Sequence, residues 1–386
     1  MNGLMRSHRL LAVTAASVFC FFGASHATEA KELSYAIGFA PGSMVDQAAQ
    51  AYAERIADAT NGDITIQVYP LSLMNLIETG PGLRDNLADI GYVLSPYYAA
   101  EYVHSNLINE LNMSGVLREA SGAESLAFTG AVIEYVMTKC PTCLAEFEAQ
   151  SQIYMGGGAS TPYMLLCNKP VTSETELNGK RIRSGAGSFQ RFAEHFNAVG
   201  VQLAANEVFE GLSQGVIDCA MLSAPDLQNL VLEELVSDIT LGIPGGIYTS
   251  AQVNVNTSVW QDLTDDQRAA FLQASAFASA HMSWTYHESA AKVLEAAEAR
   301  GTNIHEPSSA TIEAMQAFVR ADHEKIAAQY QETYGVANAK EMAAEFMPVL
   351  DRWHDLVADV ESMTDLEEVY WNEIYSKIDP STYGMN

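Results

Sequence analysis

The amino-acid sequence predicts an α/β protein of two domains that share a cleft, arranged as a clamshell. Strand-like and helix-like segments alternate from residue 32 to about residue 200, which is typical of a largely parallel sheet. About 360 residues follow a leader-like start, more than a single hydrophobic core usually holds. Two stretches also echo each other: LRDNLADIGYVLSP (83–96) and LSQGVIDCAMLSAP (212–225) each lead through an aspartate into an apolar strand that ends at Ser and then Pro.

Residues 1–27 predict a secretory signal peptide. Arg6 and Arg9 precede an apolar run over 10–22, and small residues lead to a cleavage site that we expect after Ala27. No later segment has the uninterrupted apolar length of a membrane span. We therefore expect a soluble protein that is exported to the periplasm.

The chain is strongly acidic, with 20 basic against 48 acidic side chains and a formal net charge of −28. Loss of the two arginines in the signal segment leaves 18 against 48, or −30. Such a surface repels nucleic acid and anionic lipid, so neither is expected as a partner. It also offers no general attraction for an anionic ligand, so any anion site must be built locally.

The first domain begins with alternating elements. We expect a strand over 33–39, a turn over 40–43, an amphipathic helix over 44–59 that ends before an Asn-Gly pair, and a second strand over 64–69 closed by proline. This order is typical of an α/β domain with parallel neighbours.

A second α/β region follows. We expect a strand over 163–166, a short helix opened by a capping box from Ser173 to Glu176, a strand over 180–183 and a helix over 189–199. The carboxyl ends of such strands form the edge at which open α/β sheets bind ligands.

The last third of the sequence predicts long helices. Thr264 and Gln267 form another capping box, which opens a helical tract through residue 300. Helical periodicity then continues over 309–377, broken near Gly335 and Met363.

We place domain I at 28–158 plus about 248–288, and domain II at 159–247 plus about 289–386. No Pro- or Gly-rich linker separates them. We therefore expect strands and helices that cross from one domain to the other.

Four cysteines follow the signal segment: Cys140, Cys143, Cys167 and Cys219. In an oxidising compartment the C-P-T-C pair favours a structural disulfide, either within the pair or from it to Cys167. The alternative is a thioredoxin-like redox motif, which needs a low-pKa thiolate at the start of a helix. No thioredoxin-sized βαβ pattern surrounds the pair, so we prefer the structural interpretation.

Gly211-Leu212-Ser213-Gln214-Gly215 matches G-x-S-x-G, the nucleophile elbow of serine hydrolases. That motif acts only where a strand enters the serine and a helix leaves it. Here the order is reversed: helical spacing precedes Ser213, and Val216-Ile217 begins a strand after it. We expect Ser213 to be a polar residue in the last turn of a helix.

Other catalytic patterns are absent from the sequence. It has no H-E-x-x-H, Walker loop or strand-linked G-x-G-x-x-G. His281 and His287 are six residues apart and lie on different helix faces, a poor spacing for a metal pair. The glycine run over 156–158 could cradle an anion but is a weak signal. We expect a non-enzymatic protein with no cofactor and no metal.

Several short blocks occur in a characteristic order along the chain. They are Thr60-Asn61-Gly62 with 64–70, the Asp-Ile-Gly within 83–91, LNGKRIR (177–183), Val199-Gly200, 207–209, 215–218, Asn256 and WQDL (260–263). In this order they resemble the TRAP-transporter periplasmic solute-binding proteins, the C4-dicarboxylate-binding receptor family. The resemblance covers the chain to about residue 300 and implies a periplasmic-binding-protein clamshell, in which Ser213 belongs to a shared helix-Gly-strand segment.

The resemblance implies that Arg183, the last residue of LNGKRIR, binds the ligand's carboxylate through a bidentate contact. A guanidinium fork at a strand end is always charged and matches planar carboxylate or sulfonate oxygens. The alternative is an arginine paired with a surface acid. Arg181, two residues earlier in the same segment, is the competing candidate.

The sequence departs from relatives that bind acidic sugars, because the strand before LNGKRIR carries no second arginine. Tyr163 or Met164 lies nearest to that position, which favours an aromatic or apolar contact and argues against a dicarboxylate. Further candidate contacts lie at strand ends and in the loops after them. They are Ser43, Met44, Asn75, Tyr97 and Tyr98 in the first domain, and Asn206, Met221 and Ser223 in the second.

These expectations converge on a receptor that captures a small organic anion between its domains and delivers it to the permease of a TRAP transporter. The alternatives are an ABC-type solute receptor and, from another class, an exported thiol oxidoreductase or serine hydrolase. We expect a monomer, with a dimer through the long carboxyl-terminal helices as the alternative. The sequence does not distinguish a carboxylate from a sulfonate ligand.

Overall fold

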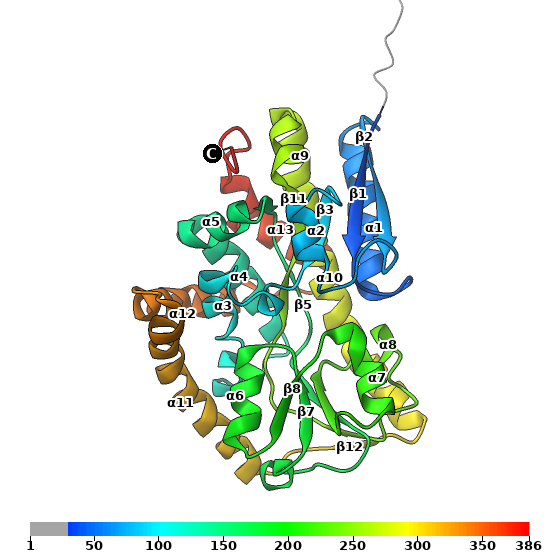
Figure 1. Cartoon of the computed structure of the whole chain (residues 1–386), viewed down its shortest axis with the longest axis vertical. Coiled ribbons are helices and arrows are strands. Elements are labelled where there is room, and N and C mark those ends of the chain that lie inside the picture. Colours follow the sequence, from blue (N-terminus) through cyan, green and yellow to red (C-terminus); the bar gives the residue numbers. More distant parts are fainter. Residues whose placement is uncertain (1–29, 386) are drawn as a thin grey trace, which may run out of the picture.

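The computed structural model describes residues 30–385, and the predicted signal peptide (1–27) lies outside them. The chain forms two lobes, each built around one six-stranded sheet, with the first lobe at the top of Figure 1 and the second at the bottom. The predicted α/β class with two lobes is confirmed. Within the described residues, no helix is both long and apolar enough to cross a bilayer.

The sheet of the first lobe is mixed. Its strands are β1 (Lys31–Ile37), β2 (Ile64–Pro70), β3 (Ile90–Val93), β4 (Gln152–Tyr154), β5 (Gly158–Ala159) and β11 (Thr249–Asn256). The order is β2-β1-β3-β11-β4, with β5 also beside β11. β1 is parallel to its two neighbours, whereas β11 is antiparallel to β3, β4 and β5. The chain therefore returns to this sheet after building part of the second lobe, as expected for crossing segments.

Helices cover the first sheet. They are α1 (Met44–Ala59), α2 (Thr79–Arg84), α3 (Val103–Asn109), α4 (Glu124–Lys139), α5 (Pro141–Ala149) and α9 (Thr257–Asp262), with short 3-10 turns η1 (Ser95–Tyr97) and η2 (Ser114–Leu117). Ser43 caps α1 by accepting a 3.2 Å hydrogen bond from the Asp46 N–H. Beyond the helix, Gly62 takes a φ of +80°, which suits glycine and turns the chain into β2.

The sheet of the second lobe has the order β12-β10-β6-β9-β7-β8. Its strands are β6 (Met164–Cys167), β7 (Arg181–Ser184), β8 (Val199–Gln202), β9 (Cys219–Leu222), β10 (Asp238–Thr240) and β12 (Asn303–His305). β7 lies between β8 and β9 and is parallel to both. The carboxyl ends of β7 and β9 therefore meet at one edge, which faces the first lobe.

The second lobe has shorter helices. They are α6 (Gly187–His195), α7 (Val208–Ser213) and α8 (Asp226–Asn229), with 3-10 turns η3 (Glu174–Leu177) and η4 (Ala205–Glu207). The helix predicted over 189–199 ends four residues early, because Val199 already pairs with Arg181 as the first residue of β8. Ser213 lies at the end of α7, with Gly215 at φ +66° before β9, so the predicted helix-to-strand order is confirmed.

Long helices connect and cover the lobes. They are α10 (Asp265–Ala299), α11 (Ser309–Tyr334), α12 (Ala339–Leu356) and α13 (Met363–Glu373), followed by a 3-10 turn, η5 (Tyr375–Lys377). Thr264 and Gln267 cap α10 reciprocally, as predicted. α10 contributes Phe271 to the first hydrophobic core and Val293 to the second. In Figure 1, α11 runs along one side of the molecule from the second lobe toward α12.

The helices α12 and α13 pack against the first lobe. Phe346, Trp353 and Tyr370 belong to the first core, and the Trp353 ring lies so close to Gly130 of α4 that a Cβ there would clash. The sequence had assigned 289–386 to the second domain. The domain limits stay a prediction, but these helices share the core of the first sheet.

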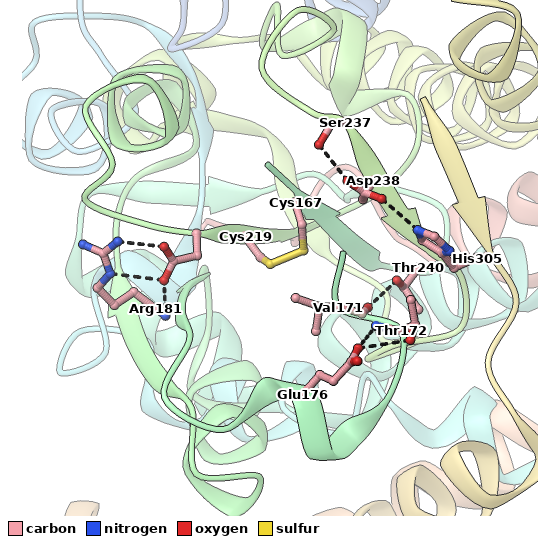
Figure 2. Close-up of a disulfide and its surroundings, with 11 residues drawn as sticks. Cys167, Val171, Thr172, Glu176, Arg181, Cys219, Ser237, Asp238, Thr240 and His305 are labelled. Carbon is pink, nitrogen blue, oxygen red and sulfur yellow. Dashed lines mark hydrogen bonds and ion pairs between the residues drawn. A yellow bond between two sulfur atoms is a disulfide. The ribbon is translucent and has the colours of Figure 1, made fainter. Parts of the chain in front are cut away.

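Each of the two disulfides joins cysteines of a single lobe. Cys140 and Cys143 are bonded across the first turn of α5, which is one of the two predicted pairings. Cys167 is bonded to Cys219, and Figure 2 shows this bond between β6 and β9. The predicted alternative of a link from C-P-T-C to Cys167 is therefore wrong. The two cysteines are directly opposed in the antiparallel β6–β9 pair, a register that the sequence does not reveal.

Candidate functional site

A cavity lies between the two lobes. Residues of both sheets, of the connecting segments and of α10 form its wall, which is rich in aromatic side chains. The lining residues are Phe39, Tyr92, Leu94, Tyr97, Ser160, Tyr163, Arg183, Ala205, Leu222, Asp226, Tyr248, Met282 and Tyr286. An apolar cleft between domains with few polar groups is the typical form of a small-molecule site.

Arg183 is the only cation among the described residues that line this cavity, and it is 1% exposed. It lies on β7, two residues after Arg181, which is exposed at the start of the strand. Its guanidinium donates hydrogen bonds to the carbonyls of Leu203 (3.1 Å) and Met221 (3.4 Å) and to the Tyr97 hydroxyl (2.9 Å). These bonds use three of the five N–H groups of an arginine side chain and hold the other two in a fixed orientation.

The surroundings of Arg183 support its charge. Burial lowers the pKa of the guanidinium, but Tyr97, Tyr163, Tyr248 and Asp226 more than offset this, so the net pKa is above the ordinary arginine value. A permanently charged, oriented fork in a low-dielectric cavity is suited to a carboxylate.

Tyr97 connects the lobes at the cavity. It extends from η1 of the first lobe, and its hydroxyl accepts hydrogen bonds from Arg183 and from the Ala205 N–H, both at 2.9 Å. Both donors belong to the second lobe. The Tyr97 hydroxyl is therefore bonded to the opposite wall of the cleft.

Tyr163 forms the aromatic floor of the second lobe. Its ring is nearly parallel to those of Phe189, with centroids 4.9 Å apart, and Tyr248, with centroids 6.1 Å apart. Burial raises the pKa of the Tyr163 hydroxyl well above its ordinary value, so the group stays neutral. Tyr163 thus presents a flat, uncharged surface to the cavity.

Asp226 is an acid that the sequence analysis did not select. It follows β9 at the start of α8, is 6% exposed and lines the cavity. Its Oδ2 accepts hydrogen bonds from the Ser223 N–H (3.1 Å) and hydroxyl (2.7 Å), and its Oδ1 from the Tyr286 hydroxyl (3.4 Å). Burial raises its pKa, although the Ser223 bonds and Arg183 oppose that effect. Ser223, a predicted contact, lies behind Asp226 and orients it.

Ser43 and Met44 line a separate recess at the mouth of the cleft. Ser43 caps α1, and the Met44 N–H donates a 3.0 Å hydrogen bond to the Asn229 Oδ1 of the second lobe. The structure thus places them at a contact between the lobes and outside the aromatic cavity.

The other predicted contacts lie outside the cavity wall. Asn75 accepts hydrogen bonds from the N–H groups of Ile77 and Glu78 and shapes the turn before α2. The Tyr98 hydroxyl donates to Ile77 and accepts from Gly80 within the first lobe. Asn206 is exposed, and Met221 contributes its carbonyl, not its buried side chain, to Arg183. A role in binding stays a prediction for these residues.

Sequence reasoning missed most of the aromatic wall. Phe39 lies just beyond β1, Tyr92 in β3 and Tyr248 just before β11, three segments that come together only in the folded sheet. Tyr286 lies within α10, where nothing in the helical pattern distinguishes it. Of these missed residues, only Asp226 could have been found from the sequence. It lies three residues after Ser223, directly after the repeated segment over 212–225.

The two motifs that suggested an enzyme, G-x-S-x-G and C-P-T-C, do not form a catalytic site. Ser213 is exposed, and its hydroxyl donates to the Glu210 carbonyl within its own helix. Cys140 and Cys143 are 3% and 0% exposed and bonded to each other. Within residues 30–385, no group of three or more His, Cys, Asp or Glu side chains is arranged to hold a metal ion.

Comparison with known proteins places this geometry in context. The family model described as bacterial extracellular solute-binding protein, family 7, matches residues 35–330. A curated solute-binding protein of Albidiferax ferrireducens is 22% identical over 240 residues, which cover 61% of this chain and 67% of the relative.

Solved structures share the fold. One is a TRAP solute-binding protein from Rhodoferax ferrireducens with copurified benzoate, with a TM-score of 0.72 and 18% identity over 84% of this chain and 99% of that chain. Another is a marine metagenome TRAP solute-binding protein described as specific for pyroglutamate, with a TM-score of 0.70 and 17% identity over 83% and 99%. At these identities the similarity concerns the fold.

Proposed function

The chain belongs to bacterial extracellular solute-binding protein family 7, and from this membership we propose that it is the receptor of a TRAP transporter that binds a small organic acid in the cleft between its lobes. The family consists of solute-binding proteins and is not a class of enzymes. The proposed receptor acts in the periplasm and passes its ligand to the membrane permease. The family membership favours a TRAP receptor over an ABC-type receptor, although both kinds of receptor have the clamshell arrangement.

One observation carries the proposal: a buried, oriented Arg183 faces an aromatic cavity that is closed by residues of both lobes. An isolated buried guanidinium is costly unless charges or hydrogen bonds satisfy it, so its presence there favours an anionic ligand. Contacts from both lobes would stabilise the closed arrangement when the ligand binds.

The cavity favours a monocarboxylate with a flat or apolar body. No second cation lines it among the described residues, so a second carboxylate would be buried without a partner. The rings of Tyr163, Tyr248 and Phe39 offer apolar surface instead. The benzoate and pyroglutamate bound by the similar structures are acids of this kind, and they guide the choice of compounds to test.

The proposal is tested by titrating the protein without its signal segment with benzoate, phenylacetate, mandelate and pyroglutamate, using calorimetry and thermal shift. A specific ligand at a hundredfold excess over its Kd adds about 2.7 kcal/mol of stability. We expect at least one acid to bind, and Arg183→Ala to abolish that binding because it removes the only cation that lines the described cavity.

Two substitutions serve as controls for this test. Arg181→Ala removes an exposed arginine of the same strand that is paired with Asp218, and Ser213→Ala removes the hydroxyl of the hydrolase-like motif. Both are expected to bind with wild-type affinity. Unchanged affinity in Arg183→Ala, or no binding of any acid by the wild type, would refute the proposal.

A further inference from the structure

We propose that Asp226 is a second ligand-binding residue of the cleft, and that it selects acids carrying a hydrogen-bond donor, a hydroxyl or an N–H group, apart from their carboxylate. This inference rests on the proposed function and narrows its substrate class. It assigns the two charged residues of the described cavity wall to two different groups on one ligand: Arg183 to the carboxylate and Asp226 to the donor.

The fold brings Arg183 and Asp226 to the same edge of one sheet. Arg183 lies near the carboxyl end of β7, and Asp226 follows the carboxyl end of β9, the parallel neighbour of β7. Both side chains line the cavity and both are buried, at 1% and 6% exposure. Each affects the other's ionisation, although no hydrogen bond joins them. A ligand in the cavity therefore meets one fixed cation and one fixed acid.

The hydrogen bonds around Asp226 define it as an acceptor. The Ser223 N–H can only donate, and the Ser223 hydroxyl also donates to the same oxygen, Oδ2. The Tyr286 hydroxyl accepts a 2.8 Å bond from the Asn229 amide, and its own proton points to Asp226 Oδ1 at 3.4 Å. Burial raises the pKa of Asp226, but every polar partner opposes this and favours the carboxylate form, in which Asp226 accepts and does not donate.

Asp226 Oδ1 has capacity for a further donor. Each carboxylate oxygen can accept about two hydrogen bonds, and the one bond to Oδ1 is long. Nearby, the buried Tyr248 hydroxyl on the cavity wall has no hydrogen-bond partner among the described residues. A ligand with polar substituents would satisfy both groups. An unsubstituted acid would leave a buried carboxylate facing apolar atoms, which is unfavourable.

The magnitude of the expected selection follows from hydrogen bonds to charged groups. A site built to accept a donor discriminates strongly against an analogue that lacks it, because its own buried polar group is then left unpaired. We expect a donor-bearing acid to bind about 10- to 100-fold more tightly than its matched analogue.

The test uses two pairs of acids that differ in the donor alone. Mandelate is compared with phenylacetate, which lacks the hydroxyl. Pyroglutamate is compared with 3-oxocyclopentanecarboxylate, in which a CH₂ group replaces the ring N–H. Calorimetry gives the affinity ratio within each pair for the wild type. At least one pair is expected to show the preference for the donor.

Asp226→Asn is the decisive variant. The Ser223 N–H needs an acceptor, so the amide oxygen of the introduced asparagine takes the place of Oδ2. The amide NH₂ group then takes the place of Oδ1. A ligand donor at this point meets another donor in place of an acceptor. We expect the affinity ratio to fall to within about threefold. The matched control is Asp238→Asn, another buried acid of the second lobe, which is bonded to Ser237, Asn303 and His305 outside the cavity. It should keep the wild-type ratio.

The outcomes separate this inference from the proposed function. If acids bind through Arg183 but the two members of each pair bind equally well, the role of Asp226 is overturned and the receptor function stands. A preference that survives in Asp226→Asn would overturn it as well. No binding by any of the four acids would remove both proposals. If Asp226→Asn fails to fold, the inference is judged on the affinity ratios of the wild type within the two pairs of acids.

Discussion

At the scale of single residues, the cavity depends on hydroxyl groups that form hydrogen bonds with more than one partner. The Tyr97 hydroxyl accepts from Arg183 and from the Ala205 N–H, so it both orients the guanidinium and bonds the first lobe to the second. Phenylalanine at this position would leave the two donors without their acceptor, and unpaired buried donors are costly.

We expect Tyr97→Phe to weaken acid binding by about thirtyfold, because the closed arrangement loses two hydrogen bonds of about 1 kcal/mol each. Calorimetry with an acid identified in the titration measures this change. The neighbouring Tyr98→Phe is the matched control. The Tyr98 hydroxyl bonds only within the first lobe, so its loss should lower the melting temperature with little change in affinity. Equal affinity losses in both variants would contradict this account.

The sequence selected Arg183, Tyr97 and Met221 as candidates but not most of the other charged and aromatic residues of the cavity wall. LNGKRIR is a local signal that draws attention to Arg183. Asp226, Tyr248 and Tyr286 become neighbours only when β9, the segment before β11 and α10 pack together. Such proximity is a property of tertiary structure, which periodicity in a single sequence does not encode.

At the scale of elements, an exposed ion pair fastens β7 to the turn that precedes β9. Arg181 and Asp218 are joined by paired hydrogen bonds, with nitrogen-to-oxygen distances of 2.7 and 3.2 Å. Figure 2 shows Arg181 on the same side of the view as Cys219 of the disulfide. The Arg181 side chain lowers the pKa of the Asp218 carboxyl.

Because the pKa of Asp218 is lowered by folding, its contribution to stability is complete above the ordinary aspartate pKa of about 3.9 and is lost as the pH falls through the folded value. We expect Asp218→Asn to melt slightly below the wild type at pH 7, and this difference to shrink as the pH falls below about 4. Melting curves from pH 2 to pH 8 measure it. A difference that grows on acidification would contradict the prediction.

The elements themselves were largely predictable. The strand-turn-helix over 33–59 has its cap at Ser43 and its stop at Gly62, both local signals, and the Thr264 capping box marks the start of α10. The Cys167–Cys219 bond was not predictable, because it depends on the register of β6 against β9. The packing of α12 and α13 on the first lobe was missed for the same reason: helical periodicity gives a buried face but not the partner of that face.

At the scale of the whole molecule, a buried ionic cluster joins the lobes away from the cavity. Arg191 of α6 pairs with Glu110 at the end of α3 (2.8 Å) and with Asp322 of α11 (2.7 Å). Glu110 also accepts a 2.8 Å hydrogen bond from the Gly187 N–H. Burial raises the pKa of Glu110, while Arg191 opposes that shift. Glu110 is thus the acid through which the first lobe engages α6.

We expect Glu110→Gln to weaken acid binding by up to about tenfold without altering the ratio within either pair of acids. The reason is that it destabilises the closed arrangement and leaves the cavity unchanged. Calorimetry gives the affinities, and small-angle scattering without ligand should show a larger radius of gyration than the wild type. Glu176→Gln, whose carboxylate bonds only to nearby Thr172, is the control. A changed ratio would place Glu110 in ligand recognition instead.

The continuous helix α10 has a mechanical consequence for the whole molecule. Its 35 residues span about 52 Å, with one end fixed in the first core and the other in the second. Any separation of the lobes must bend α10 or pivot at its anchored ends, and α11, whose residues also enter both cores, forms a second connection between the lobes. The opening angle is therefore limited by the stiffness of these helices, and the two lobes stay aligned while they part.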